Sequence, residues 1–145
     1  MTGVVLCGGK SLRMGSDKGL LRNKEGVCWS ASAYQKLAEL KIKVVVSVNN
    51  QQGSYKNIFR EDQLMIDNPS LLLGGPLLGL LSVHLQFPKE DLLVLACDMT
   101  DMNTEVLRFL YKKYNQKPDE AMVFSDAGFA EPLCGIYSSS GLKKI

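Results

Sequence analysis

Glycines and cations gather in the segment 6–21, LCGGKSLRMGSDKGLL, which directly follows the short apolar run 3–6. Within this segment lie Gly8, Gly9, Gly15, Lys10, Arg13 and Lys18. Glycine lets a loop turn tightly and brings backbone N–H groups close to an anion, while lysine and arginine offset its negative charge. The residue types and their spacing therefore favour a polyphosphate-binding loop over a solvated surface loop.

Two common phosphate-binding motifs do not fit this segment. A P-loop needs four residues between its first glycine and the Gly-Lys pair, whereas five residues separate Gly3 from Gly9. The dinucleotide motif G-x-G-x-x-G fails as well, because Gly8 and Gly9 are adjacent and the next glycine is Gly15. The sequence therefore does not indicate a simple ATPase or a dehydrogenase.

Two aspartates follow strand-like runs and are candidate ligand-binding residues. Asp98 comes after the apolar run 92–97, and Mg²⁺ is commonly bound by one or two carboxylates together with substrate phosphates. The alternative for Asp98 is an aspartate that caps a turn or helix, and Asp101 is a rival ligand. Asp67 precedes Asn68-Pro69, a turn-prone pair, so a nucleotide contact and an Asx turn both fit.

Apolar runs alternate with amphipathic segments along the chain, which predicts a single α/β domain over residues 1–145. Strands are expected at 3–6, 44–48, 63–66, 92–96 and 121–124, and helices at 27–40, 76–86 and 104–114. Continuous apolar runs are typical of parallel strands that are covered on both faces. We therefore expect a doubly wound, Rossmann-like, mainly parallel sheet in three α/β/α layers. Ligands bind such sheets beyond the carboxyl ends of the strands, where Gly8, Asn49, Asp67 and Asp98 fall.

The composition is that of an ordinary globular domain, with 46% hydrophobic residues and a net charge of +2. This charge is too small to indicate nucleic acid or a membrane surface as a partner. The cysteines fit no metal-ligand spacing and no signal peptide is visible, so we expect a reduced, cytoplasmic protein. No residue pattern determines the oligomeric state, and we expect a monomer or a weak homo-oligomer. The only histidine, His84, lies on a leucine-rich pattern and is interpreted as a helix-surface or core residue.

The glycine segment resembles the signature L-A-G-G-x-x-x-R-M-G-x-x-K of the MobA-like nucleotidyltransferases of molybdenum-cofactor biosynthesis. The residues in register are Leu6, Gly8, Gly9, Arg13, Met14, Gly15 and Lys18. Later segments are similar to the family's blocks in the same order: Asp67-Asn68, Gly75-Pro76-Leu77 through Gly79, Cys97-Asp98-Met99 and Glu131-Pro132-Leu133. Cys7 replaces the usual alanine, and Thr100 replaces the usual proline. The ordered set is most similar to the molybdenum cofactor guanylyltransferases.

This resemblance implies a nucleotidyltransferase that transfers GMP from GTP to molybdopterin and releases pyrophosphate, with Mg²⁺ as its cofactor. It implies Arg13, Lys18 and Asp98 as catalytic residues, with Asp98 as the metal ligand. It also implies a nucleotide-binding set at the strand ends: Leu6, Cys7, Gly8, Gly9, Lys18, Ser47, Asn49, Asp67 and Asp98. A related enzyme that uses CTP or a sugar-phosphate acceptor, and a nucleotide-binding module without chemistry, are the alternatives.

Family members usually continue through a further helix and a segment that resembles N-x-N-T-P. This sequence ends at Ile145, in GLKKI. We therefore expect the domain 1–145 to lack the family's C-terminal segment, and the sequence supports nucleotide binding more strongly than catalysis.

Overall fold

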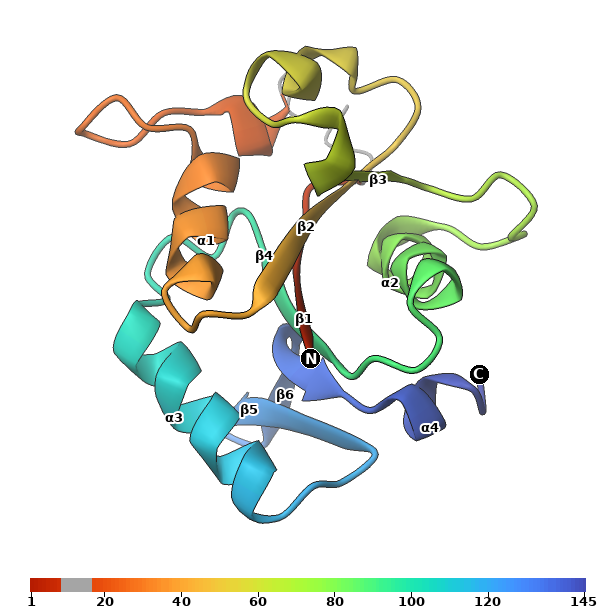
Figure 1. Ribbon diagram of the computed structural model, residues 1–145. Helices are drawn as coiled ribbons and strands as arrows, with labels where there is room; N and C mark the ends of the chain where they lie inside the picture. Colours follow the sequence, from red (N-terminus) through yellow and green to blue (C-terminus); the bar gives the residue numbers. More distant parts are fainter. Residues whose placement is uncertain (9–16) are drawn as a thin grey trace.

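Six strands form one mixed sheet at the centre of the molecule, in the order β3-β2-β1-β4-β6-β5 (Figure 1). The computed structural model describes residues 1–8 and 17–145. The strands are β1 (Thr2–Leu6), β2 (Lys43–Val48), β3 (Leu64–Ile66), β4 (Leu92–Ala96), β5 (Ala121–Asp126) and β6 (Phe129–Tyr137). The helices are α1 (Trp29–Ala38), α2 (Gly75–Gln86), α3 (Thr104–Gln116) and α4 (Ser139–Leu142), with 3-10 helices η2 (Lys18–Leu20), η3 (Gly53–Asn57) and η4 (Glu61–Gln63).

The parallel part of the sheet consists of β3, β2, β1 and β4, with β1 between β2 and β4. Its central strands are apolar because both of their faces are covered. Val5 packs in the cluster that includes α1 and α3, and Val4 packs in the opposite cluster with α2 and α4, as Figure 1 shows for the two helical layers. The predicted three-layer, mainly parallel α/β architecture is confirmed.

The three predicted helices are present, with ends that differ by about two residues from the sequence prediction. At α3, the Asn103 side chain accepts a hydrogen bond from Val106 N at 2.9 Å, a favourable N-cap. At α2, Pro76 lies in the first turn, where its missing N–H costs no helical hydrogen bond. At α1, the buried face carries Ala33 and Leu37, which pack on the sheet.

Helix α2 is apolar on almost every side, and two of its polar residues face inward. Ser82 and His84 are buried, whereas Leu77 and Leu85 are exposed. The Ser82 hydroxyl donates to Leu78 O at 2.7 Å and accepts from Asn68 N at 2.8 Å. The second bond holds the start of the loop between β3 and α2 against the helix. Across residues 1–8 and 17–145, none of the helices combines the length and apolar character needed to cross a bilayer.

Strand β6 (Phe129–Tyr137) was not predicted. It runs antiparallel between β4 and β5, and its register against β5 shifts between Val123 and Phe124. Pro132 and Gly135 lie inside β6, and both residues weaken a strand pattern in sequence. Gly135 is required by close packing, because a Cβ atom there would lie 2.5 Å from Val123 Cγ1. The predicted strand at 121–124 is confirmed as part of β5.

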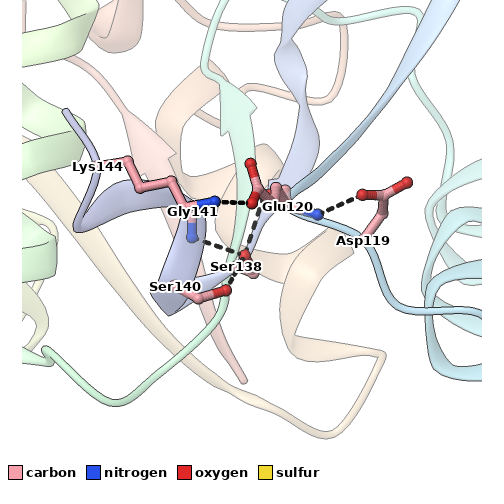
Figure 2. Close-up of polar contacts among 6 residues, drawn as sticks. All are labelled: Asp119, Glu120, Ser138, Ser140, Gly141 and Lys144. Carbon is pink, nitrogen blue, oxygen red and sulfur yellow. Dashed lines mark hydrogen bonds and ion pairs between the residues drawn. The ribbon is translucent and has the colours of Figure 1, made fainter.

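The C-terminal helix α4 is held to the start of β5 by polar contacts (Figure 2). The Ser138 hydroxyl caps the helix by accepting from Gly141 N at 2.9 Å, and it donates to Glu120 O at 3.2 Å. The Glu120 carboxylate forms an ion pair with Lys144. These contacts fix α4 beside α2, where Leu142 joins the core.

Candidate nucleotide site

The parallel strands all end at one edge of the sheet, and backbone hydrogen bonds continue the ladder into the loops that follow. Cys7 N donates to Ser47 O at 3.0 Å, and Cys97 N donates to Leu6 O at 3.1 Å. Asp67 N bonds the carbonyl of the last residue of β2 at 2.9 Å. The predicted meeting of strand ends is confirmed, because residues from four strands are held side by side at this edge.

Two glycines leave room for a polar pair on the β2–β3 side of the site. The Ser47 side chain is fully buried, and its hydroxyl donates to Asp67 Oδ1 at 3.4 Å. A Cβ atom at Gly8 would lie 3.3 Å from Asp67 Oδ2, and one at Gly79 would lie 2.6 Å from Ser47 Oγ. Gly79 therefore allows α2 to pack closely on Ser47 without displacing it. Through this hydrogen bond, the buried Ser47 orients the Asp67 carboxylate.

Asp67 is suited to accept hydrogen bonds from a ligand. Burial raises the pKa of Asp67, and the hydrogen bond from Ser47 lowers it in part. A half-buried carboxylate of this kind gains from N–H or O–H donors that replace lost water. Asn49 instead stabilises its own turn, because its side-chain oxygen accepts from Gln51 N at 2.9 Å and its N–H donates to Gln52 Oε1 at 2.8 Å.

A pocket of about 220 Å³ opens on the β1–β4 side of the same edge. At its mouth Lys18 Nζ lies 3.6 Å from Asp98 Oδ2, with the two side chains 41% and 42% exposed. The described residues that line the pocket are Leu6, Cys7, Gly8, Asp17, Lys18, Pro76, Ala96, Cys97, Asp98 and Leu133. Five of the predicted site residues therefore line this pocket: Leu6, Cys7, Gly8, Lys18 and Asp98. Gly8 also lies beside two others, Asp67 and Asn49.

Asp98 offers a hard oxygen ligand to a divalent cation. Among the described residues, no three side chains of His, Cys, Asp or Glu gather into a metal-binding group. A single carboxylate fits Mg²⁺ in a nucleotide site, because phosphates and water commonly supply its other ligands. Asp101, the rival in sequence, is exposed and is absent from the described pocket lining.

Sequence reasoning missed the role of Asp17 and its partners. Tyr55 donates to Asp17 Oδ1 at 2.7 Å, and Gln52 Nε2 donates to Asp17 Oδ2 at 2.6 Å. Gly19 N also donates to Oδ1, at 3.1 Å. No pattern in the sequence singles out Gln52 or Tyr55, because they lie 35 and 38 positions after Asp17, on or beside the short helix η3. The position of Asp17 directly before Lys18 was the one available signal.

Two thiols form the inner wall of the pocket. Cys7 and Cys97 follow the neighbouring strands β1 and β4, and both are buried. A hydrogen bond with Cys97, together with burial, raises the pKa of Cys7. A thiol with a raised pKa is a poor nucleophile near neutral pH. Cys7 and Cys97 therefore serve as small packing residues in the wall of the pocket.

Gly9 and Arg13, two further predicted site residues, lie outside the described residues. The helix predicted at 76–86 is confirmed as α2, and Pro76 in its first turn lines the pocket. His84 is buried in α2, in agreement with its interpretation as a core or helix residue. The polar groups that face the pocket in the described structure therefore come from the strand ends and from residues 17 and 18.

Comparison with known protein sequences connects this site to a family. The model of the MobA-like NTP transferase domain matches residues 3–145. A probable molybdenum cofactor guanylyltransferase from Geobacillus sp. (strain WCH70) is 31% identical, with the match covering 100% of this chain and 73% of the relative. A molybdenum cofactor biosynthesis bifunctional protein from Synechocystis sp. is also 31% identical, with the match covering 97% of this chain and 40% of the relative. The chain therefore spans less than half of that bifunctional protein.

Solved structures share the fold. Molybdopterin-guanine dinucleotide biosynthesis protein A from Archaeoglobus fulgidus superposes with a TM-score of 0.75 at 22% identity, over 99% of this chain and 70% of that chain. The bifunctional IspDF from Campylobacter jejuni gives a TM-score of 0.68 at 15% identity, over 99% of this chain and 42% of that chain. At these identities the likeness shows the fold, and the predicted Rossmann-like nucleotidyltransferase fold is confirmed.

Proposed function

The chain belongs to the MobA-like NTP transferase family, and we propose on this basis that it transfers GMP from GTP to molybdopterin and releases pyrophosphate. The observation that supports the proposal most directly is the meeting of two polar groups at one sheet edge. Asp67 with Ser47 lies on one side of Gly8, and Lys18 with Asp98 lies at the pocket on the other side. A nucleoside triphosphate needs both, because it carries donors at one end and several negative charges at the other.

In this proposal the nucleoside lies against β2 and β3. The Asp67 carboxylate, oriented by Ser47, accepts hydrogen bonds from the nucleoside. In the described residues, the backbone from Leu6 through Gly8 contacts the base in this proposal, and Gly8 allows a close approach because it carries no side chain. Asn49 stabilises the turn that follows β2 and so supports the β2–β3 side of the site.

The triphosphate extends toward the pocket in this proposal. Lys18 and Arg13 bind the leaving pyrophosphate by charge-assisted hydrogen bonds, and Asp98 holds Mg²⁺. When bound, Mg²⁺ offsets the negative charge on the phosphate oxygens. Lys18 exchanges its contact with Asp98 for phosphate oxygens, which leaves the Asp98 carboxylate available for Mg²⁺.

The reaction that follows needs no covalent enzyme intermediate. An oxygen of the acceptor's phosphate attacks the α-phosphorus of GTP, and the bond between that phosphorus and the oxygen bridging to the β-phosphate breaks. The electron pair leaves with pyrophosphate. An acceptor phosphate is already ionised near neutral pH, so the side chains act by alignment and charge stabilisation.

The test is a nucleotide panel followed by a transfer assay. GTP with Mg²⁺ should raise the melting temperature more than CTP, ATP or UTP, because saturation at a hundred times Kd adds about 2.7 kcal/mol to the free energy of unfolding. With molybdopterin present, pyrophosphate release should accompany formation of the dinucleotide. Equal shifts with all four nucleotides would contradict the guanine assignment. GTP binding without transfer would contradict the proposed reaction and favour the alternative, a nucleotide-binding module without chemistry.

A further inference from the structure

A partly buried hydrogen-bond network surrounds Asp17, the residue before Lys18. The Asp17 carboxylate accepts from Tyr55 Oη at 2.7 Å, from Gln52 Nε2 at 2.6 Å and from Gly19 N at 3.1 Å. The bond from Gly19 alone would cap the short helix η2. The two side-chain donors come from a separate part of the chain, and together with Gly19 N they give the Asp17 carboxylate three hydrogen bonds.

Gln52 links this carboxylate to the end of β1. Its Nε2 group also donates to Cys7 O at 2.9 Å, and its Oε1 atom accepts from Asn49 N at 2.8 Å. One side chain therefore connects the turn after β2 with residues 7 and 17. In the sequence, both of these residues belong to the predicted polyphosphate-binding segment 6–21.

Tyr55 is built into the core from which its hydroxyl reaches Asp17. The side chain is fully buried, and its ring stacks on Phe59 with a centroid distance of 6.4 Å. Burial, with the neighbouring Cys7 and Asp17, raises the pKa of Tyr55, so the hydroxyl remains a donor. A Cβ atom at Gly19 would overlap the Tyr55 hydroxyl, so a glycine is required where η2 crosses it.

We propose that Gln52 and Tyr55 are positioning residues that act through Asp17 to hold Lys18 at the pocket for the triphosphate. This inference rests on the proposed function. The network gives Lys18 a fixed backbone while its side chain remains 41% exposed to a ligand. In enzymes generally, a misplacement of about 1 Å at the reacting centre can cost about a hundredfold in rate.

The first variant is Tyr55→Phe, with Tyr114→Phe as a matched control. Tyr114 is also buried, and its hydroxyl donates to an aspartate, Asp91, at 2.8 Å, but at the opposite edge of the sheet. Both variants lose a hydrogen bond to a carboxylate and should lose similar stability. With Mg²⁺ present, only Tyr55→Phe should weaken GTP binding, by about tenfold, while binding of GMP changes by less than about twofold.

The comparison of GTP with GMP distinguishes positioning from general support of the fold. A merely structural role would weaken both nucleotides equally in Tyr55→Phe, and that result would overturn the inference. Gln52→Met, which removes both donated bonds but keeps the chain length, should show the same selective loss. Unchanged GTP affinity in both variants would also overturn it.

A double-mutant cycle tests whether the network acts through Lys18. Tyr55→Phe introduced into Lys18→Ala should add little to the loss of GTP affinity, because the group that it positions is already absent. If the two substitutions instead add their full separate losses of GTP affinity, the network does not act through Lys18. If the wild-type protein prefers another nucleotide, the guanine assignment fails, but the same triphosphate-to-monophosphate comparison with that nucleotide still tests the network. Absence of all nucleotide binding overturns both proposals.

Discussion

Replacing Asp98 by asparagine should change nucleotide binding in opposite directions with and without magnesium. The variant keeps the size of the side chain and removes its charge. Without metal, the Asp98 carboxylate repels phosphate and engages Lys18 Nζ at 3.6 Å. With metal, the same carboxylate is the proposed ligand for Mg²⁺, which prefers anionic oxygen. One substitution therefore removes an inhibitory contact in one condition and a required ligand in the other.

The size of the metal-free effect follows from the geometry of the pair. At 3.6 Å, Coulomb's law gives about 1 kcal/mol in water and about 5 kcal/mol at an effective dielectric constant of about 20. Because the Lys18 and Asp98 side chains are 41% and 42% exposed, the pair belongs near the lower limit, at about 1 kcal/mol or less. Asp98→Asn should therefore lower the free energy of unfolding by no more than this amount and strengthen metal-free GTP binding by up to about fivefold.

The assay measures GTP affinity by titration calorimetry in chelator and in Mg²⁺, and then pyrophosphate release by the full-length protein. In Mg²⁺, Asp98→Asn should bind GTP more weakly and lose at least about a hundredfold in transfer rate, because charge stabilisation at the α-phosphate is removed. Asp101→Asn is the matched control, since Asp101 is an exposed aspartate in the same segment. Magnesium-dependent turnover that survives in Asp98→Asn would refute the assignment and direct attention to Asp67.

Two further variants test the packing around the site and the one buried histidine. Gly79→Ala should weaken nucleoside binding, GMP included, because a Cβ atom would lie 2.6 Å from Ser47 Oγ and displace the partner of Asp67; unchanged GMP affinity would show that α2 can shift without cost. His84 is buried, its Nδ1 atom has no hydrogen-bond partner within residues 1–8 and 17–145, and burial with nearby Lys143 lowers its pKa below 6.5. The unfolded chain then binds more protons, so stability should be fully present above about pH 7 and fall as the pH drops toward 5. His84→Leu should flatten this part of the pH–stability curve measured by urea unfolding, and an unchanged slope would assign it to other groups.

The parallel strands and their ends were predictable because their sequence pattern depends on burial alone. Runs such as 92–96 are apolar at every position, and the residues that follow them must meet at one edge. Strand β6 was missed because Pro132 and Gly135 interrupt its pattern, although tertiary pairing with β4 and β5 overrides both. The Asp17 network was missed for a different reason. Its donors are 35 and 38 positions away in sequence, so only tertiary packing, which brings Gln52 and Tyr55 beside residues 7 and 17, forms the network.

The nucleoside side of the site, at β2 and β3, and the mouth of the pocket, at Lys18 and Asp98, differ in rigidity. This difference predicts which property of the reaction each side determines. Ser47 is fully buried and Gly79 lies in close contact with it, so the nucleoside side is part of the rigid core. Lys18 and Asp98 are half exposed and contact each other, so they must exchange partners when a charged ligand arrives. We therefore expect substitutions on the nucleoside side to change which base is bound, and substitutions at the pocket mouth to change the rate and the dependence on metal and salt.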